Sequence, residues 1–195
     1  MALRAVVFDV GETLVDETGM WERAADAAGV PRFTLMGVLG GLAARGEHHA
    51  RAWEILEVEP PGSAWGRDDF YPDAFPCLAE LRSRGVLVGA VGNTPAETED
   101  LLRDQVDLVG SSGRWGIEKP APAFFERIAT EAGVAAEEIA YVGDRVDNDV
   151  RPARAAGMVA VHVRRGPWGH LQRGADEAHV QVRSLVELPE ALARV

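Results

Sequence analysis

The chain has 195 residues, of which 47% are hydrophobic and 26% charged, and its formal net charge is -11 at pH 7. This length and balance suit one compact core with room for a small accessory module. An acidic surface repels nucleic acid and anionic lipid, because phosphate backbones are bound mainly through cationic patches. We therefore expect neither a nucleic acid nor a membrane as a partner.

The single cysteine, Cys77, excludes an internal disulfide, and no Cys/His cluster has the spacing of a zinc site. No apolar run approaches the length of a membrane span, and the N-terminus leads into a strand-like run without a signal-peptide pattern. These features predict a cytoplasmic protein.

The first predicted element is the apolar run 5–8, whose β-branched and aromatic residues are typical of a strand buried in a parallel sheet. The region 15–74 has a different character, because alanine-rich segments at helical spacing precede a break at Glu59-Pro60-Pro61-Gly62. We interpret this region as a helical insertion. Its predicted helices cover residues 21–28, 33–44 and 48–56.

After residue 74, helical and strand-like segments alternate, which implies βαβ units. The predicted fold class is therefore α/β, with a doubly wound parallel sheet. Ligands of such sheets bind beyond the carboxyl ends of the strands, where Asp9, Asn93 and Asp144 stand. The predicted helices are 74–84, 96–104, 122–132 and 149–156, the strands are 86–91, 106–109, 139–142 and 159–163, and a short strand near Val180 and a helix after Pro189 close the chain.

Three rare residues lie in the loops that follow these strands. Lys119 is the only lysine among 20 Lys and Arg residues, and Asn93 and Asn148 are the only asparagines. A compact ammonium group in a chain that otherwise uses arginine indicates a specific contact with an anionic oxygen or a carboxylate. The alternative is a codon bias that spared one lysine by accident.

Four strand-end loops carry these residues and a set of acids. They are Asp9-Val10-Gly11-Glu12-Thr13-Leu14, Gly92-Asn93-Thr94, Gly116-Ile117-Glu118-Lys119-Pro120 and Gly143-Asp144-Arg145-Val146-Asp147-Asn148-Asp149. In order, spacing and strand context they resemble the motif loops of the haloacid dehalogenase superfamily, and the insertion resembles its small helical cap. The resemblance implies a Rossmann-like core domain of residues 1–14 and 75–195 and a cap domain of residues 15–74.

The resemblance also implies a magnesium-dependent hydrolase, most simply a phosphatase of a small phosphorylated metabolite. Asp9 would be the nucleophile that forms an aspartyl-phosphate. Asp9, the backbone carbonyl of Gly11, and Asp144 would bind Mg²⁺, while Asp149 holds a metal-bound water or Lys119. Lys119 would screen the charge on the nucleophile and the transferring group. The alternative for Asp144 and Asp149 is a pair of solvated acids at the start of a helix.

Two positions depart from the family pattern. Gly11 stands where the phosphatases carry a second aspartate, the general acid/base, a group that typically contributes about 10²- to 10⁴-fold. Glu12 could supply a carboxylate in its place, or it is a loop acid without a role. Gly92 stands where a Ser or Thr hydroxyl binds the transferring phosphoryl oxygen. The backbone N–H groups of Gly92 and Asn93, with the hydroxyl of Thr94, could substitute for it as an anion nest.

The cap is expected to select the substrate by closing over the strand ends. His48 and His49 could bind the substrate or replace the missing acid, because imidazole titrates near neutrality, or they are solvent-exposed. Adjacent residues of a helix point about 100° apart, so at most one of the two is expected to face the site. Trp21 and Trp53 are more typical of core packing.

Two other functions stay open. A halide leaves without a proton, so the missing acid is compatible with hydrolysis at carbon in the dehalogenase manner, although that branch lacks Asp144 and carries an aromatic residue at the position of Gly11. The other is a non-catalytic member that binds a metabolite. Gly11 and Gly92 favour this alternative, whereas Asp9 and Lys119 oppose it.

Overall fold

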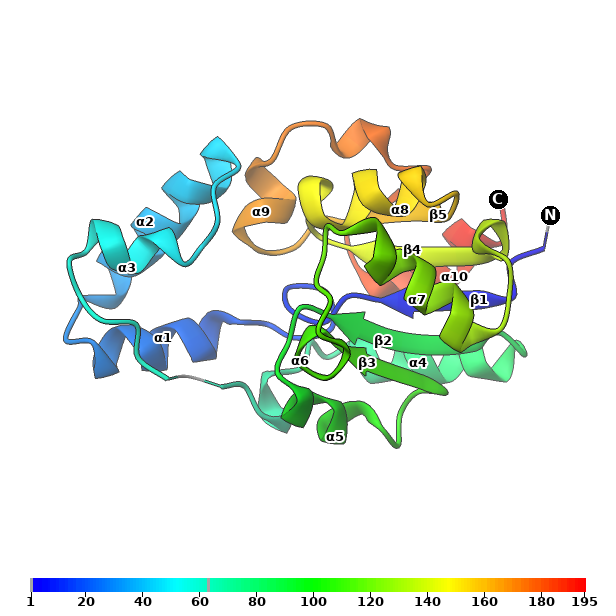
Figure 1. Ribbon diagram of the computed structural model, residues 1–195, viewed down its shortest axis with the longest axis horizontal. Helices are drawn as coiled ribbons and strands as arrows, with labels where there is room; N and C mark the ends of the chain where they lie inside the picture. Colours follow the sequence, from blue (N-terminus) through cyan, green and yellow to red (C-terminus); the bar gives the residue numbers. More distant parts are fainter. Residues whose placement is uncertain (1, 63) are drawn as a thin grey trace.

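The computed structural model describes residues 2–62 and 64–195, and it has the predicted α/β architecture (Figure 1). Six strands form one parallel sheet in the order β3-β2-β1-β4-β5-β6, so the chain winds outward in both directions from β1. The prediction of a doubly wound sheet is confirmed. The strands are β1 (Ala5–Phe8), β2 (Leu87–Gly92), β3 (Leu108–Ser111), β4 (Ile139–Gly143), β5 (Val159–Val163) and β6 (Val180–Val182).

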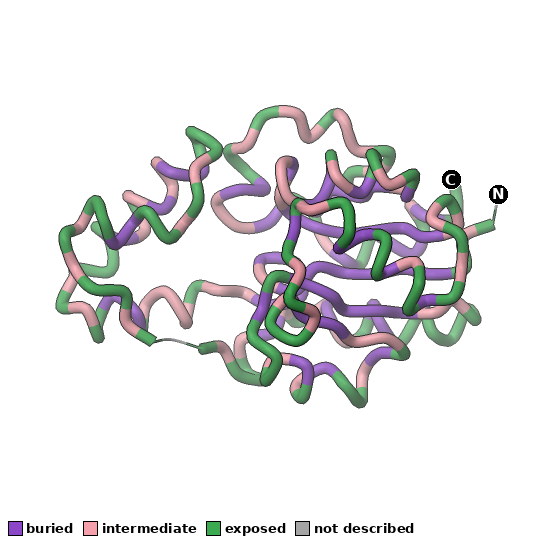
Figure 2. The backbone as a smooth tube through the Cα atoms, in the orientation of Figure 1, coloured by how far each residue is buried: buried purple, intermediate pink, exposed green. Residues whose placement is uncertain are grey.

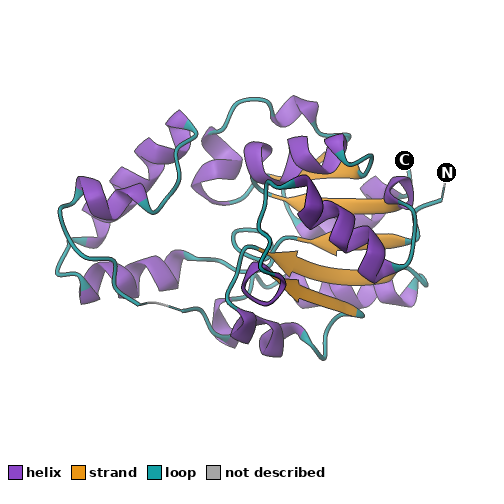
Figure 3. Ribbon diagram, viewed as in Figure 1, coloured by secondary structure: helices purple, strands orange, loops and turns teal. Residues whose placement is uncertain are grey.

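Helices cover both faces of the sheet (Figure 3). The strands are almost wholly buried (Figure 2), and their side chains alternate between two apolar clusters. Val6 and Phe8 face the cluster of α4 and α10, whereas Val7 faces the cluster of α7 and α8. The helices of this part are α4 (Ala74–Ser83), α5 (Glu99–Leu102), α6 (Ser112–Trp115), α7 (Pro122–Ala132), α8 (Arg151–Ala155), α9 (Gly166–Leu171) and α10 (Leu188–Leu192).

Residues 15–74, which we call the cap, lie beyond the carboxyl ends of the strands (Figure 1). Their helices are α1 (Thr18–Ala27), α2 (Arg32–Arg45) and α3 (Arg51–Ile55). The three helices share an apolar cluster, and α9 adds the buried Trp168 to it. Two linkers join the cap to the sheet, and a bridge between Val15 and Phe70 pairs them. The domain boundaries at residues 14 and 75 stay a prediction.

Several local predictions differ from the structure. The helix expected over 149–156 begins as a π-helical turn, Val146–Val150, before α8, and the helix expected over 48–56 shortens to α3. The short helices α6 and α9 were not predicted. Proline at the first turn of α9 is compatible with a helix start, although the surrounding glycines have turn composition. None of the helices within 2–62 and 64–195 is long and apolar enough to cross a membrane.

Candidate active site

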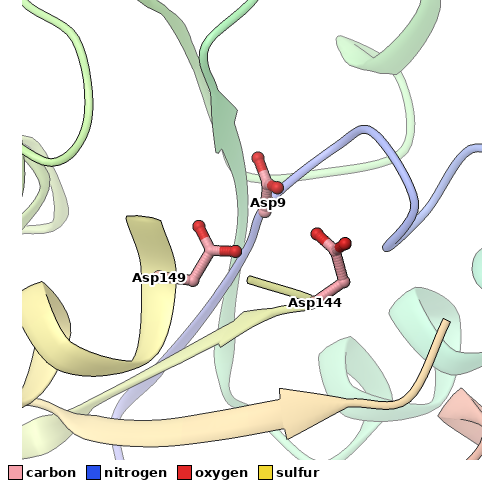
Figure 4. A group of neighbouring side chains, drawn as sticks. All are labelled: Asp9, Asp144 and Asp149. Atoms are coloured by element: carbon pink, nitrogen blue, oxygen red, sulfur yellow. The ribbon is translucent and has the colours of Figure 1, made fainter. Parts of the chain in front are cut away.

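Three carboxylates meet at the carboxyl end of the sheet (Figure 4). Asp9 follows β1, Asp144 follows the neighbouring β4, and Asp149 lies in the π-helical turn after it. One oxygen from each of the three lies within 4.8 Å of the others, and all three side chains are buried. Parallel strands bring their carboxyl ends to one edge, so residues 135 positions apart in the chain become neighbours in space.

The ammonium group of Lys119 lies between two of these acids. Its Nζ atom is 2.7 Å from Oδ1 of Asp9 and 2.5 Å from Oδ1 of Asp149, and the side chain is buried. Burial alone would lower the pKa of Lys119, but the charges of Asp149 and Asp9 outweigh it and hold that pKa well above its ordinary value. Lys119 is therefore a fixed positive charge, and the picture of a solvated loop lysine does not fit.

Asn93 fixes the backbone of the lysine loop. Its Nδ2 donates to the Lys119 carbonyl oxygen at 3.0 Å, and its Oδ1 accepts from the Lys119 N–H at 2.8 Å. Tyr141 supports the same place from β4, because its hydroxyl donates to the Val91 carbonyl and its ring centroid lies 5.5 Å from Nζ of Lys119. These contacts position the ammonium group before any ligand arrives.

Asp144 carries the least compensated charge of the cluster. It forms no ion pair in the described part of the chain. Burial, followed by the charges of Asp149 and Asp9, raises the pKa of Asp144 well above its ordinary value. Its backbone carbonyl is held by Nε2 of the buried His162 at 2.9 Å. Three buried carboxylates around one ammonium group make an oxygen donor set with excess negative charge, which suits a hard divalent cation.

The loop after β1 uses Glu12 to hold the cap linkers. Glu12 has a φ of 51°, and its Oε2 accepts from the Tyr71 hydroxyl at 2.7 Å. Its Oε1 accepts from the backbone N–H of Glu17 at 3.1 Å. Burial raises the pKa of Glu12 despite these two hydrogen bonds. Both oxygens are engaged, which favours a structural part for Glu12.

Glu17, at the start of α1, is a site residue that the sequence interpretation missed. Its Oε2 accepts from Nε1 of Trp21 at 3.1 Å, and its carboxylate lies against Gly11. A Cβ atom added at position 11 would overlap Oε1 of Glu17 and lie 3.1 Å from its Cδ. Burial, followed by the charge of Glu12, raises the pKa of Glu17 to about 8. The sequence offered one signal: Gly11 lacks the expected acid, and Glu17 is an acid that stands shortly before a predicted helix.

A cleft of about 1320 Å³ opens between the cap and the carboxylate cluster. His48 and His49 both line it, so the expectation that at most one would face the site is wrong. The reason is local: both residues precede α3, which begins at Arg51, so helical geometry does not separate them. The functional candidates along its wall are Asp9, Gly11, Glu12, Glu17, His48, His49, Asn93, Thr94, Lys119, Asp144, Arg145 and Trp168.

The anion-binding candidates divide into two. Thr94 lines the cleft, and its buried Oγ1 has no hydrogen-bond partner among the described residues. Gly92 does not line the cleft, but a Cβ atom there would lie 2.7 Å from Oδ1 of Asp9. Gly92 therefore leaves room for the Asp9 carboxylate. Thr94 provides the hydroxyl group that is free to bind an anion.

Comparisons with known proteins agree with this geometry. The model of the haloacid dehalogenase-like hydrolase family matches residues 3–157. The glyceraldehyde 3-phosphate phosphatase of Methanopyrus kandleri is 41% identical over 113 residues, which are 55% of this chain and 48% of that protein. The phosphoserine phosphatase of Thermus thermophilus is 41% identical over 109 residues, 51% of this chain and 43% of that protein. The chain thus matches about half the length of these curated relatives.

A solved structure extends the likeness to the whole fold. The crystal structure of a phosphatase of the same superfamily from Thermococcus onnurineus has a TM-score of 0.66 and 24% identity, and the alignment covers 97% of this chain and 98% of that one. At this identity the likeness shows the fold alone. Because the family model matches most of the chain and includes all four loops, the chain belongs to the haloacid dehalogenase-like hydrolase family.

Proposed function

We propose that the protein is a magnesium-dependent phosphatase of a small phosphorylated metabolite. The observation that carries this proposal is the Lys119 ammonium group, held between Asp9 and Asp149 beside an uncompensated Asp144 at the wall of the cleft. The names of the two curated relatives, a glyceraldehyde 3-phosphate phosphatase and a phosphoserine phosphatase, support the class of substrate. A cytoplasmic location stays a prediction.

The metal would be held by Asp9, Asp144 and the backbone carbonyl of Gly11. Carboxylate and carbonyl oxygens suit Mg²⁺, and the buried carboxylates exceed the single ammonium charge beside them. Asp149 accepts from Lys119 and from the N–H of Arg145, so it would act one step away, on a metal-bound water or on Lys119. When bound, Mg²⁺ would neutralise negative charge on the transferring phosphoryl group.

Asp9 would act as the nucleophile. One carboxylate oxygen attacks the phosphorus, and the bond from phosphorus to the leaving oxygen breaks, which gives an aspartyl-phosphate. Water then attacks the phosphorus, releases inorganic phosphate and restores the Asp9 carboxylate. Lys119 stabilises the negative charge on both groups, because its ammonium is already in place.

The substrate would contact two sides of the cleft. On the core side, the free Thr94 hydroxyl and the N–H group of Asn93 would bind phosphoryl oxygens, whereas Gly92, which does not line the cleft, would leave room for the Asp9 carboxylate. On the cap side, His48 lines the cleft and is exposed, so its imidazole would contact the organic part of the substrate. Glu12 would hold the cap linkers through Tyr71 and the backbone of residue 17.

The test is a metal-dependent screen of the purified protein against aryl, acyl and alkyl phosphates and 2-haloacids. We expect phosphate release that requires Mg²⁺ and that is lost in Asp9→Asn. Halide release from haloacids would instead favour hydrolysis at carbon. No turnover of any substrate, with retained binding of a phosphorylated metabolite, would identify a non-catalytic member.

A further inference from the structure

We propose that Glu17 is the general acid/base of this reaction, replacing from the cap the carboxylate that position 11 lacks. The inference rests on the proposed phosphatase function and adds a catalytic residue to it. Glu17 belongs to the linker that starts α1, six positions after Gly11, so it lies outside the motif loop that normally supplies this group.

The first argument is the space that Glu17 occupies. A Cβ atom at position 11 would overlap its Oε1, so the carboxylate fills the volume in which a side chain from position 11 would begin. With any other residue at position 11, the Glu17 carboxylate would have to move aside, because every other residue adds that Cβ atom. Gly11 and Glu17 are therefore complementary. Position 11 carries no side chain, and the Glu17 carboxylate of the cap occupies the space that a side chain there would fill.

The second argument is how Glu17 is held. Its Oε2 accepts from the indole N–H of Trp21, and its backbone N–H donates to Glu12, which Tyr71 holds in turn. In the described part of the chain nothing hydrogen-bonds to Oε1. A carboxyl group with one oxygen fixed and the other free, on the same cleft as Asp9, is arranged to exchange a proton with a ligand.

The other candidate acids are less suited. Both oxygens of Glu12 are engaged by Tyr71 and by the backbone of Glu17. The ring of His49 packs edge-on against Trp21 and Trp168, with centroid distances of 5.5 Å and 6.2 Å, so it is surrounded by aromatic groups. Glu17 is the acid beside position 11 that keeps a free oxygen.

The proposed proton transfers balance over the two steps. In the first, the Glu17 carboxyl gives its proton to the leaving oxygen as the bond from phosphorus breaks. In the second, the Glu17 carboxylate takes a proton from the water that attacks the aspartyl-phosphate, so the carboxyl group is restored.

The experiment compares Glu17→Gln with the parent on two substrates in the presence of Mg²⁺. Glutamine keeps an acceptor for Trp21 but cannot transfer the proton. On an alkyl phosphate we expect turnover to fall by about 10²- to 10⁴-fold. On 4-nitrophenyl phosphate, whose leaving group needs no proton, we expect a burst of nitrophenol close to one per enzyme followed by slow turnover, because hydrolysis of the intermediate has lost its base.

Relocating the carboxyl group gives a second test, which also covers the case that Glu17→Gln folds poorly. Glu17→Ala should lose alkyl phosphate turnover, and the double variant Glu17→Ala with Gly11→Asp should regain at least about 10-fold of it, because the acid returns to position 11. Gly11→Asp alone should gain nothing, since its side chain would overlap Glu17. Asp16→Asn is the matched control, because Asp16 is the adjacent acid, hydrogen-bonds the Thr18 N–H and does not line the cleft.

The outcomes separate this assignment from the function on which it rests. If the parent is an active phosphatase and Glu17→Gln keeps its alkyl phosphate turnover, Glu17 is not the acid/base and the phosphatase function stands. If the parent hydrolyses no phosphate ester under any metal condition, the proposed function is wrong and this assignment falls with it.

Discussion

The Nζ atom of Lys119 lies 2.7 Å from Oδ1 of Asp9 and 2.5 Å from Oδ1 of Asp149, so one ammonium group joins two loops that are 140 residues apart in the chain. A guanidinium group could not take this place without displacing a carboxylate, because its planar fork is much wider than an ammonium group. This explains why position 119 carries the single lysine among the 20 basic residues of the chain.

Lys119→Arg should therefore lose at least about 10²-fold in kcat although it preserves charge, because the fork cannot fit between the two carboxylates. Steady-state kinetics with a melting curve checks this. Lys119→Ala should also unfold more easily without metal, by about 3–5 kcal/mol, because it leaves buried carboxylates without a partner. The reverse exchange Arg103→Lys, on an exposed residue, is the control and should be neutral. Parental activity in Lys119→Arg would contradict the role assigned to the ammonium group.

Asp144→Asn should abolish the effect of Mg²⁺ on stability. In the parent, Mg²⁺ at about 100 times its Kd should add about 2.7 kcal/mol to the free energy of unfolding. Without metal the variant should be at least as stable as the parent, because burial and two neighbouring acids already disfavour the Asp144 carboxylate. Melting curves with and without Mg²⁺, together with calorimetry, measure both effects.

The matched control for this experiment is Asp147→Asn. Asp147 belongs to the same loop but pairs with Arg145 at 2.8 Å and is half-exposed. This variant should keep the Mg²⁺-dependent gain in stability. Equal magnesium affinity in the parent and in Asp144→Asn would remove Asp144 from the proposed metal ligands.

His49 should make the protein less stable in mild acid. Burial, with the charges of His48 and Arg145, lowers the pKa of His49 from 6.5 to about 4. Between these values the unfolded chain binds a proton that the folded chain does not, so the free energy of unfolding falls as the pH falls. From pH 7 to pH 5 this contribution should be about 1–2 kcal/mol after allowance for the partial burial of His49.

Denaturant unfolding of the parent and of His49→Phe at both pH values isolates this contribution. Glu17, whose pKa is raised to about 8, acts in the opposite sense in the same range and is common to both proteins, so the difference between them reports His49. Phenylalanine preserves the edge contacts with Trp21 and Trp168. An identical pH dependence in the two proteins would show that His49 is not the titrating group.

Asn93→Ala should destabilise the protein by about 1–3 kcal/mol, because the Lys119 N–H and carbonyl would lose their partner in a partly buried position. Activity should fall together with stability, since the same contacts place the ammonium group. Asn148→Ala is the control for stability, and its free energy of unfolding should change by less than about 0.5 kcal/mol. An equal loss of stability in the two variants would show that the hydrogen bonds of Asn93 do not contribute to stability as proposed.

The sheet could be predicted from the sequence because its strands are buried on both faces. Mainly apolar runs such as 139–142 and 159–163 are typical of strands buried in a parallel sheet, and β5 has the predicted bounds. The short helices α6 and α9 could not be predicted in this way. Four to six residues carry too little periodicity, and the glycines around Pro167 resemble a loop.

The residues of the carboxylate cluster could be predicted because each follows a strand, and parallel strands fix where those ends meet. Glu17 could not. Its place depends on the angle at which α1 leaves the linker. That angle is set by the contact with Glu12 and by Tyr71, which holds Glu12 from a distant part of the chain. Glu12 is nearer in sequence to the missing acid, but the turn at that residue directs its carboxylate to the linkers.

Trp168 has a consequence for how molecules enter and leave the cleft. It belongs to the apolar cluster of the cap, and the helix that carries it, α9, lies away from the linkers (Figure 1). To swing open about the linkers, the cap would have to withdraw from this indole, and exposing a large apolar side chain costs about 1.5–3 kcal/mol. This cost would make the open form the minor one. Substrate would then bind only to this minor open form. A smaller residue at position 168 would increase the population of the open form, and it would also enclose the reacting groups less tightly.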